Sequence, residues 1–148
     1  METWLSDSDY NFIFSRVPRP CVDIIIRSAE GIILSLRDIE PSKSNWHMPG
    51  GMVYKGERLK DAVVRIAKKE TGLDVKGVKF LGYMEFLSDG VVENVPRHSV
   101  SFVFEAKSPG GEFSGDFQST DIQSFRSLPT NLHPIHKKFF TENNIFNP

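Results

Sequence analysis

The chain has few of the features that mark secreted proteins, membrane proteins or proteins stabilised by a structural metal. It contains a single cysteine, Cys21, so no disulfide can form within the chain, and no Cys/His spacing resembles a zinc site. No apolar run approaches transmembrane length, and the acidic start of the sequence lacks the apolar region of a signal peptide. We therefore expect a soluble, cytoplasmic protein with no membrane partner, in which Cys21 is a buried small apolar residue.

An excess of charge of one sign is also lacking. The sequence has 18 Lys and Arg against 19 Asp and Glu, a formal net charge of -1, with both signs interspersed. Because there is no basic run or stripe, we expect no nucleic-acid polymer as partner, although a small anionic ligand would need only local positive charge. The length of 148 residues fits one domain, so residues 1–148 are expected to form a single domain.

Hydrophobic alternation predicts several strands. Two β-rich runs around a Ser-Ala-Glu-Gly turn within residues 22–37 predict a hairpin. Further strands are predicted at 78–88 and 98–107, while the glycines of the sequence HMPGGMVY interrupt another extended piece. Residues 108–120 are rich in Gly, Ser and Pro and are expected to form a long loop.

Two helices are expected among these strands. Between Glu57 and Glu70, apolar residues recur with helical spacing, and Gly72 is well placed to end the helix. Residues 131–144 are expected to form a closing helix with Pro134 in its first turn. Strands around a strongly amphipathic helix indicate a layered domain of the α/β class.

Glu70 does not fit the expected helix. At about 100° per residue it lies within about 40° of Leu59, on the side of Val63 and Ile66. It also lies in the last turn, where the helix dipole disfavours an anion. A hard cation such as Mg²⁺ would resolve both conflicts, because a carboxylate is one of its natural ligands. The alternative is a glutamate that reaches solvent or pairs with an arginine.

The spacing around Glu70 resembles a known motif. The segment from Gly51 to Leu73 is similar to the Nudix box, G-x5-E-x7-R-E-U-x-E-E-x-G-U, where U is a bulky apolar residue. The matching positions are Gly51, Glu57, Arg65, Glu70, Gly72 and Leu73. This resemblance implies the Nudix fold, in which a mixed β-sheet is sandwiched between α-helices.

Two positions depart from the box. Ile66 stands where the motif has a glutamate directly after the arginine, and Lys69 replaces the first acid of the Glu-Glu pair. The usual cluster of three acids is thereby reduced to Glu70. The GDP-mannose mannosyl hydrolases are a Nudix subfamily that lacks the same two acids, and the chain resembles them over most of its length.

That resemblance implies a metal site and a reaction. The Gly50 carbonyl, the Glu70 carboxylate and the Gln118 amide would hold one Mg²⁺. Water would attack C1 of the sugar in a nucleoside diphosphate sugar, releasing free sugar and an intact nucleoside diphosphate. The transition state would resemble that of glycoside hydrolysis, so the main demand is to neutralise charge on the departing diphosphate.

The same resemblance implies roles for five further residues. Arg37 would contact the leaving diphosphate, Asp23 would bind the nucleotide or the sugar, and His98 corresponds to a family histidine. Glu57 and Arg65 would pair to fix the loop and helix. Taken by themselves, Arg37 could be a solvated charge at a strand end, Asp23 could point outward by alternation, and His98 could be structural.

The general base is missing from the match. The subfamily has a histidine directly after its glutamine ligand, where this chain has Ser119, and serine is not a useful base at neutral pH. Asp116, Asp121 and His98 are the candidates to replace it. Gln118 itself could be an ordinary polar loop residue.

Two other functions stay open at this stage. An ordinary Nudix pyrophosphohydrolase would attack phosphorus with acids supplied from other loops, and a Nudix-fold module would bind nucleotides without turnover. The subfamily resemblance also implies a homodimer formed through the N-terminal segment. Residues 9–20 have the apolar content for that contact, but they could equally cover their own core.

Overall fold

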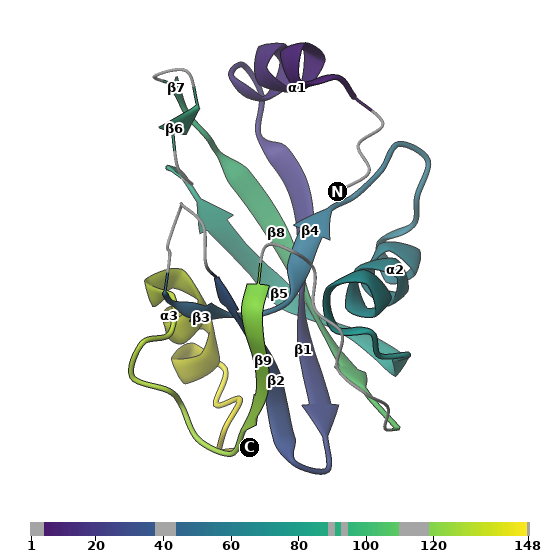
Figure 1. Cartoon of the computed structure of the whole chain (residues 1–148), viewed down its shortest axis with the longest axis vertical. Coiled ribbons are helices and arrows are strands. Elements are labelled where there is room, and N and C mark those ends of the chain that lie inside the picture. Colours follow the sequence, from purple (N-terminus) through teal and green to yellow (C-terminus); the bar gives the residue numbers. More distant parts are fainter. Residues whose placement is uncertain (1–4, 38–43, 89–90, 93–94, 110–118, 148) are drawn as a thin grey trace.

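The computed structural model describes residues 5–37, 44–88, 91–92, 95–109 and 119–147. Within these ranges it contains three helices and nine strands (Figure 1). In chain order they are α1 (Asp7–Phe14), β1 (Arg19–Ser28), β2 (Gly31–Arg37), β3 (Trp46–His47), β4 (Gly50–Met52), α2 (Leu59–Thr71), β5 (Lys76–Phe86), β6 (Val91–Val92), β7 (Val95–Pro96), β8 (Ser99–Lys107), β9 (Ser119–Phe125) and α3 (Pro134–Glu142).

The main sheet is mixed, as the sequence predicted. Its strands follow the order β3-β2-β1-β8-β5, with β4 also paired to β1 and β9 also paired to β2. The β1–β8 pair is parallel, whereas every other pair in this sheet is antiparallel. β1 therefore contacts β2, β4 and β8 and connects all the other strands of the sheet.

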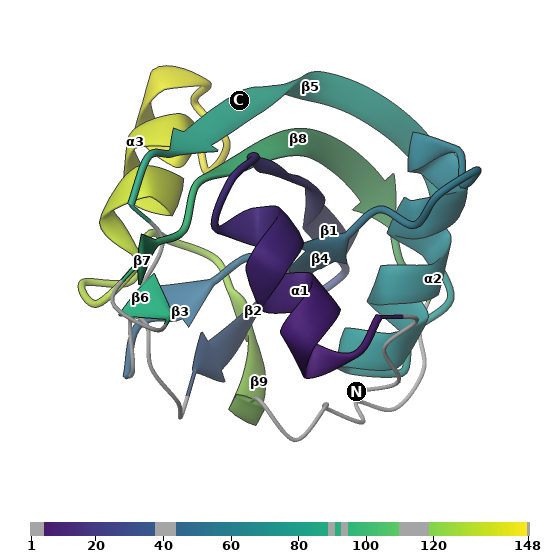
Figure 2. The same cartoon turned by 90° about the horizontal axis from the view of Figure 1, so that it is seen from above.

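Two helices cover opposite faces of the sheet (Figure 2). Along β1, Val22, Ile24 and Ile26 are buried in a core cluster with residues of α2. Ile25, which alternates with them, is buried on the other face in a cluster with Phe139 and Phe140 of α3. Successive side chains of a strand point to opposite faces, so one continuous apolar run serves both layers. The expected α/β architecture is confirmed.

The predicted helices are present with small changes at their ends. The first was expected from Glu57 to Glu70, but α2 begins at Leu59 because Glu57 belongs to the preceding loop. Gly72 adopts the left-handed conformation, with φ of 77°, and its N–H donates to the Lys68 carbonyl at 2.8 Å. α3 runs from Pro134 to Glu142, shorter at both ends than the expected 131–144, with Pro134 in its first turn as predicted.

Three features differ from the expectations. The loop expected over 108–120 ends earlier, because β9 begins at Ser119 and pairs with β2. Cys21 is half-buried rather than buried. Residues 9–20 contain most of α1, whose N-terminus is capped by the Ser6 hydroxyl accepting from Asp9 N–H at 3.1 Å. Over the described ranges, no helix has the length and apolar character needed to cross a membrane.

Two histidines hold the backbone of Met48, directly ahead of β4. The Met48 N–H donates to Nδ1 of His136 in α3 at 2.9 Å. The Met48 carbonyl lies 2.8 Å from Nδ1 of His47, which must carry the proton because a carbonyl only accepts. Both bonds are made by neutral imidazoles, and the His136 bond ties the segment ahead of β4 to α3.

Burial keeps both imidazoles neutral. It lowers the pKa of His47 from 6.5 to about 4 against the hydrogen bond to the Met48 carbonyl, which raises the pKa, while electrostatic interactions with Arg37 and His133 lower it further. Burial also lowers the pKa of His136 well below 6.5, with smaller contributions from His133 and His47. Unfolded histidines take up protons near pH 6.5, whereas the folded protein resists protonation. Their contribution to stability is therefore full above pH 6.5 and is lost as the pH falls toward 4.

We expect the free energy of unfolding, measured by urea titration, to decrease steadily between pH 6.5 and about 4. In His136→Asn the amide oxygen can accept the Met48 N–H without titrating, so the decrease should be smaller. Parallel curves for the wild type and this variant would contradict the assignment to buried imidazoles.

Candidate functional site

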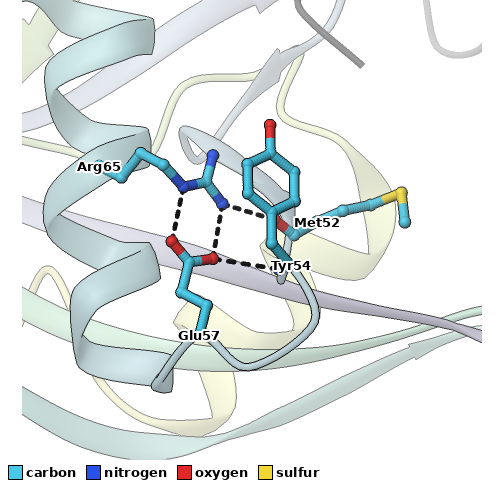
Figure 3. Close-up of polar contacts among 4 residues, drawn as sticks. All are labelled: Met52, Tyr54, Glu57 and Arg65. Carbon is cyan, nitrogen blue, oxygen red and sulfur yellow. Dashed lines mark hydrogen bonds and ion pairs between the residues drawn. The ribbon is translucent and has the colours of Figure 1, made fainter. Parts of the chain in front are cut away.

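The loop between β4 and α2 is held by a bidentate ion pair. Nε of Arg65 lies 2.7 Å from Oε2 of Glu57, and Nη2 lies 2.9 Å from Oε1 (Figure 3). Nη2 also donates to the Met52 carbonyl at 2.8 Å, while the Tyr54 N–H donates to Oε1 of Glu57 at 3.1 Å. The pairing that the sequence predicted is present, and it joins α2 to both ends of the loop.

The Tyr54 ring strengthens this arrangement. The Arg65 guanidinium carbon lies 3.9 Å from the ring centroid, a cation–π contact. The hydrogen bond from Arg65 lowers the pKa of Glu57, and the same bond raises the pKa of Arg65. Both side chains are mostly screened from solvent, so the pair differs from an exposed surface ion pair of little energetic value.

Ile66, the first departure from the box, is a core residue. It is buried in the α2 core cluster, and its Cδ1 would lie 3.2 Å from a Cβ placed on Gly51. The side chain therefore fills the space between α2 and β4. A carboxylate at this depth would need a counter-charge, so the residue at this position serves apolar packing.

Gly50 and Asp23 face each other across β4 and β1. The neighbouring pairs carry the hydrogen bonds: Ile24 N–H donates to the Pro49 carbonyl at 2.9 Å, and Val53 N–H to the Pro20 carbonyl at 3.0 Å. Antiparallel pairs alternate, so Asp23–Gly50 is a pair without hydrogen bonds, and the Gly50 carbonyl is directed away from β1.

The Asp23 carboxylate is buried rather than turned outward, which the sequence alone had left open. Only 9% of the residue is exposed, and the Ser101 hydroxyl of β8 donates a hydrogen bond to Oδ2. A Cβ on Gly50 would collide with Oδ1 and would lie 2.8 Å from the Val22 carbonyl oxygen. The carboxylate thus occupies the space that a side chain at Gly50 would need.

Glu70 lies at the end of α2 and is half-buried, not buried as the helical periodicity suggested. Within the described residues no group of three or more His, Cys, Asp or Glu side chains forms a metal site. The Glu70 carboxylate and the outward-directed Gly50 carbonyl are nevertheless oxygen donors, which suit a hard cation such as Mg²⁺. Gln118, the third expected ligand, lies outside the described residues.

The remaining predicted residues lie in different parts of the sheet. Arg37 ends β2, is half-buried, and pairs in register with Ser119 of β9. His98 directly precedes β8, and its carbonyl accepts from Arg19 N–H at 2.8 Å. Nε2 of His98 is buried and has no hydrogen-bond partner among the described residues. Asp121 accepts from the Gln123 amide at 2.8 Å, and Asp116 lies outside the described residues.

Three contributing residues were missed by the sequence analysis. Tyr54 stacks on Arg65, Ser101 binds Asp23, and His136 holds Met48. The serine left a signal, because the small polar Ser99 and Ser101 alternate with the apolar residues of β8. The other two contacts depend on loop and helix placement, which periodicity does not report.

Comparison with known proteins gives a family match over most of the chain. The family model described as the NUDIX domain matches residues 17–143. The low-salt glycan biosynthesis protein Agl8 of Haloferax volcanii is 32% identical over 139 residues, which cover 93% of this chain and 89% of that protein. The ADP-ribose pyrophosphatase of Methanocaldococcus jannaschii is 35% identical over 115 residues, which cover 76% of this chain and 65% of that protein.

Solved structures agree in fold. The MutT protein of Methanosarcina mazei superposes with a TM-score of 0.71 at 19% identity, covering 89% of this chain and 97% of its own. A MutT NUDIX hydrolase from Burkholderia pseudomallei gives 0.70 at 23% identity, covering 83% and 95%. The expected arrangement of sheet and helices is therefore that of the Nudix fold.

Gly50→Ala should destabilise the protein by at least about 2 kcal/mol, because the new methyl group overlaps the Asp23 carboxylate and the Val22 backbone. Gly51→Ala is the matched control: its methyl group meets only the flexible end of Ile66, so we expect a loss within about 1 kcal/mol. Urea unfolding of both variants measures the difference, and equal losses would contradict the close approach at Gly50.

Arg65→Lys should lower the free energy of unfolding by about 1–3 kcal/mol, because an ammonium group cannot reproduce the bidentate bond to Glu57 or the stacking on Tyr54. Arg58→Lys makes the same chemical change at the exposed N-cap residue that precedes α2, whose side chain forms no capping bond. It should leave the urea midpoint unchanged, and similar shifts in both variants would show that the pair contributes little.

Proposed function

Because this chain belongs to the Nudix family, we propose that it is a Mg²⁺-dependent hydrolase of a nucleoside diphosphate sugar of the GDP-mannose type. Water attacks C1 of the sugar, and the products are the free sugar and a nucleoside diphosphate. The observation that carries this proposal is that Ile66 and Lys69 replace two of the three acids of the box, with Ile66 buried in the core, so that Glu70 is the acid retained.

The loss of two acids favours attack at carbon. An ordinary pyrophosphohydrolase uses several carboxylates to hold metals that activate water against phosphorus. Cleavage at C1 needs less, since an oxocarbenium-like transition state forms with modest help and the protein must mainly stabilise charge on the departing diphosphate. One divalent cation and one guanidinium can supply that stabilisation.

The residues take the following roles in this proposal. The Gly50 carbonyl, the Glu70 carboxylate and the Gln118 amide would hold Mg²⁺, and the cation would supply charge neutralisation at the diphosphate. Arg37, at the end of β2, binds the same diphosphate through its guanidinium. Asp23 accepts a hydrogen bond from a hydroxyl of the substrate, while the Glu57–Arg65 pair keeps the loop and α2 in place.

The proton of the attacking water goes to a side chain other than Ser119. His98 has a buried ring nitrogen with no hydrogen-bond partner among the described residues. Asp121, on β9, accepts an exposed hydrogen bond from the Gln123 amide. Without a base in the usual place, we expect turnover about 10²–10⁴-fold below that of an enzyme with a well-placed one.

A second function is supported by the relatives. One is named an ADP-ribose pyrophosphatase and others are named RNA pyrophosphohydrolases. Attack on phosphorus would need acids from segments outside the described residues, where the sequence includes Asp116. A binding module without turnover is the third possibility, and the Glu70 carboxylate argues against it because a pure scaffold does not require that acid.

We also propose that the protein acts as a homodimer through its N-terminal segment, in a cytoplasmic setting. Support comes from Phe12 and Val17, which remain 61% and 49% exposed beside α1. Apolar side chains of this size on a helix and its following turn are suited to contact with a second copy.

The deciding experiment is product analysis with GDP-mannose and Mg²⁺ in ¹⁸O-labelled water. We expect GDP and mannose, with the label on the sugar. GMP and mannose 1-phosphate, with the label on phosphate, would mean that phosphorus is attacked and that the second function is correct. Absence of turnover over a panel of nucleotide sugars, together with tight nucleotide binding, would indicate the binding module.

Two glutamate variants make this experiment specific to the site. Glu70→Gln removes the charge of the proposed ligand and should reduce turnover by about 100-fold or more. Glu85→Gln makes the same change at an exposed position on β5, away from the loop, and should keep wild-type turnover. Equal rates for the two variants would remove Glu70 from the proposed metal site.

A further inference from the structure

We propose that α1 controls the exposure of the His98 ring, and that Tyr10 is the positioning residue through which the helix acts. In the docked position of α1, the Tyr10 hydroxyl joins the helix to the residues on both sides of His98. This role of Tyr10 does not depend on which substrate the protein takes. Its effect on turnover rests on the proposed function, in which His98 is a candidate to accept the proton of the attacking water.

α1 depends on few side chains for its position. It lies beyond the end of the sheet at which β1 begins (Figure 1), and of its eight residues only Phe14 is buried. A helix this short is marginal by itself in water, so its position is set by the contacts that its side chains make. Phe12, on the same helix, is largely exposed. The polar contacts of Tyr10 are therefore more important here than they would be on a helix with a wide buried face.

The Tyr10 hydroxyl lies between two guanidinium groups. Nη1 of Arg19 donates to the hydroxyl oxygen at 2.8 Å, and Nη1 of Arg97 donates to it at 3.3 Å. The Arg97 guanidinium carbon also lies 4.8 Å from the centroid of the Tyr10 ring, and the ring meets Phe14 edge-on at 4.9 Å. Hydrogen bonds from charged donors are stronger than those between neutral groups, so the hydroxyl adds to the docking that the ring provides. We call Tyr10, Arg19 and Arg97 the Tyr10 cluster.

The Tyr10 cluster holds the chain on both sides of His98. Arg97 directly precedes the histidine in the sequence, and the Arg19 N–H donates to the His98 carbonyl at 2.8 Å. The Arg19 side chain also donates through Nε and Nη2 to Oγ of the buried Ser99, directly after the histidine, at 2.9 and 2.7 Å. One hydroxyl of α1 is therefore connected to residues 97 and 99, and these contacts fix the segment between them.

The His98 ring is held in a position that is unfavourable by itself. Its Nε2 is buried and has no hydrogen-bond partner among the described residues, whereas in water it would be bonded to solvent. A buried polar atom without a partner costs free energy, which the contacts of the surrounding segment must offset. Loss of the Tyr10 hydroxyl removes part of that offset. The population in which the segment opens and Nε2 meets water should then rise.

The test is the reactivity of His98 toward diethyl pyrocarbonate, which modifies imidazole nitrogens that reach solvent, with each histidine followed by mass spectrometry. Tyr10→Phe keeps the ring contacts with Phe14 and Arg97 but loses both bonds to the hydroxyl. We expect the modification rate of His98 to rise about tenfold, because hydrogen bonds from charged donors are lost from the closed state.

The chain supplies two controls. His47 on β3 and His136 on α3 lie outside the Tyr10 cluster and bind the Met48 backbone, so their modification rates should change less than about twofold. Tyr83→Phe removes the same hydroxyl from a side chain on β5 that is 61% exposed, and it should leave the rate of His98 unchanged.

Two results would overturn the proposal. The first is an unchanged His98 rate in Tyr10→Phe. The second is a parallel rise at His98, His47 and His136, because α1 would then stabilise the whole fold rather than the segment that carries His98.

Turnover of GDP-mannose tests the catalytic consequence separately. In Tyr10→Phe we expect kcat to fall about tenfold while KM changes less than about twofold, and in a His98→Gln background the same substitution should have no further effect on kcat. Full kcat together with a raised His98 rate would keep the role of Tyr10 and remove His98 as the proton acceptor. If the wild type turns over no nucleotide sugar, the proposed function fails, and the reactivity of the histidine alone decides the role of Tyr10.

Discussion

The close approach of β4 to β1 at Gly50 and Asp23 is the contact on which the rest of the site depends. β1 joins the sheet through β2, β4 and β8, and β4 carries the glycine whose carbonyl is directed outward. The missing side chain at Gly50 admits the Asp23 carboxylate. Because the contact leaves no room for adjustment, it sets the position of the loop that follows and the place where α2 begins.

α2 contributes to both the core and the candidate site, and different residues along the helix make the two contributions. Arg65 reaches back to Glu57 and the Met52 carbonyl, which fixes the helix relative to the loop. The next residue, Ile66, points into the core and packs toward Gly51. Glu70, in the last turn of the helix, is half-exposed. The helix has gained apolar packing where related motifs carry charge.

Much of this architecture could be read from the sequence, because it depends on local pattern. Periodicity located α2, its stop at Gly72 and the strands around it, and the motif spacing identified the pairing of Glu57 with Arg65. Contacts between distant segments left weaker signals. β9 begins inside the expected loop, and no strand was predicted for the rest of it. The burial of Asp23 follows from the β1–β8 register, which alternation cannot supply. The helical periodicity placed Glu70 on the buried side, and the structure shows it half-exposed. Periodicity does not report where the end of a helix extends beyond the sheet that covers it.

The hydrogen bond between Met48 and His136 has a consequence for protein synthesis. It joins two residues separated by 88 positions, and the histidine lies in the last helix of the chain. While the ribosome is still making α3, the hairpin of β1 and β2 and the whole of α2 are already available to fold. The backbone ahead of Gly50 still lacks one of its two imidazole partners. The nascent chain can therefore form the β1–β2 hairpin and the Glu57–Arg65 pair early, but the Met48 N–H gains its imidazole acceptor only after α3 has been made.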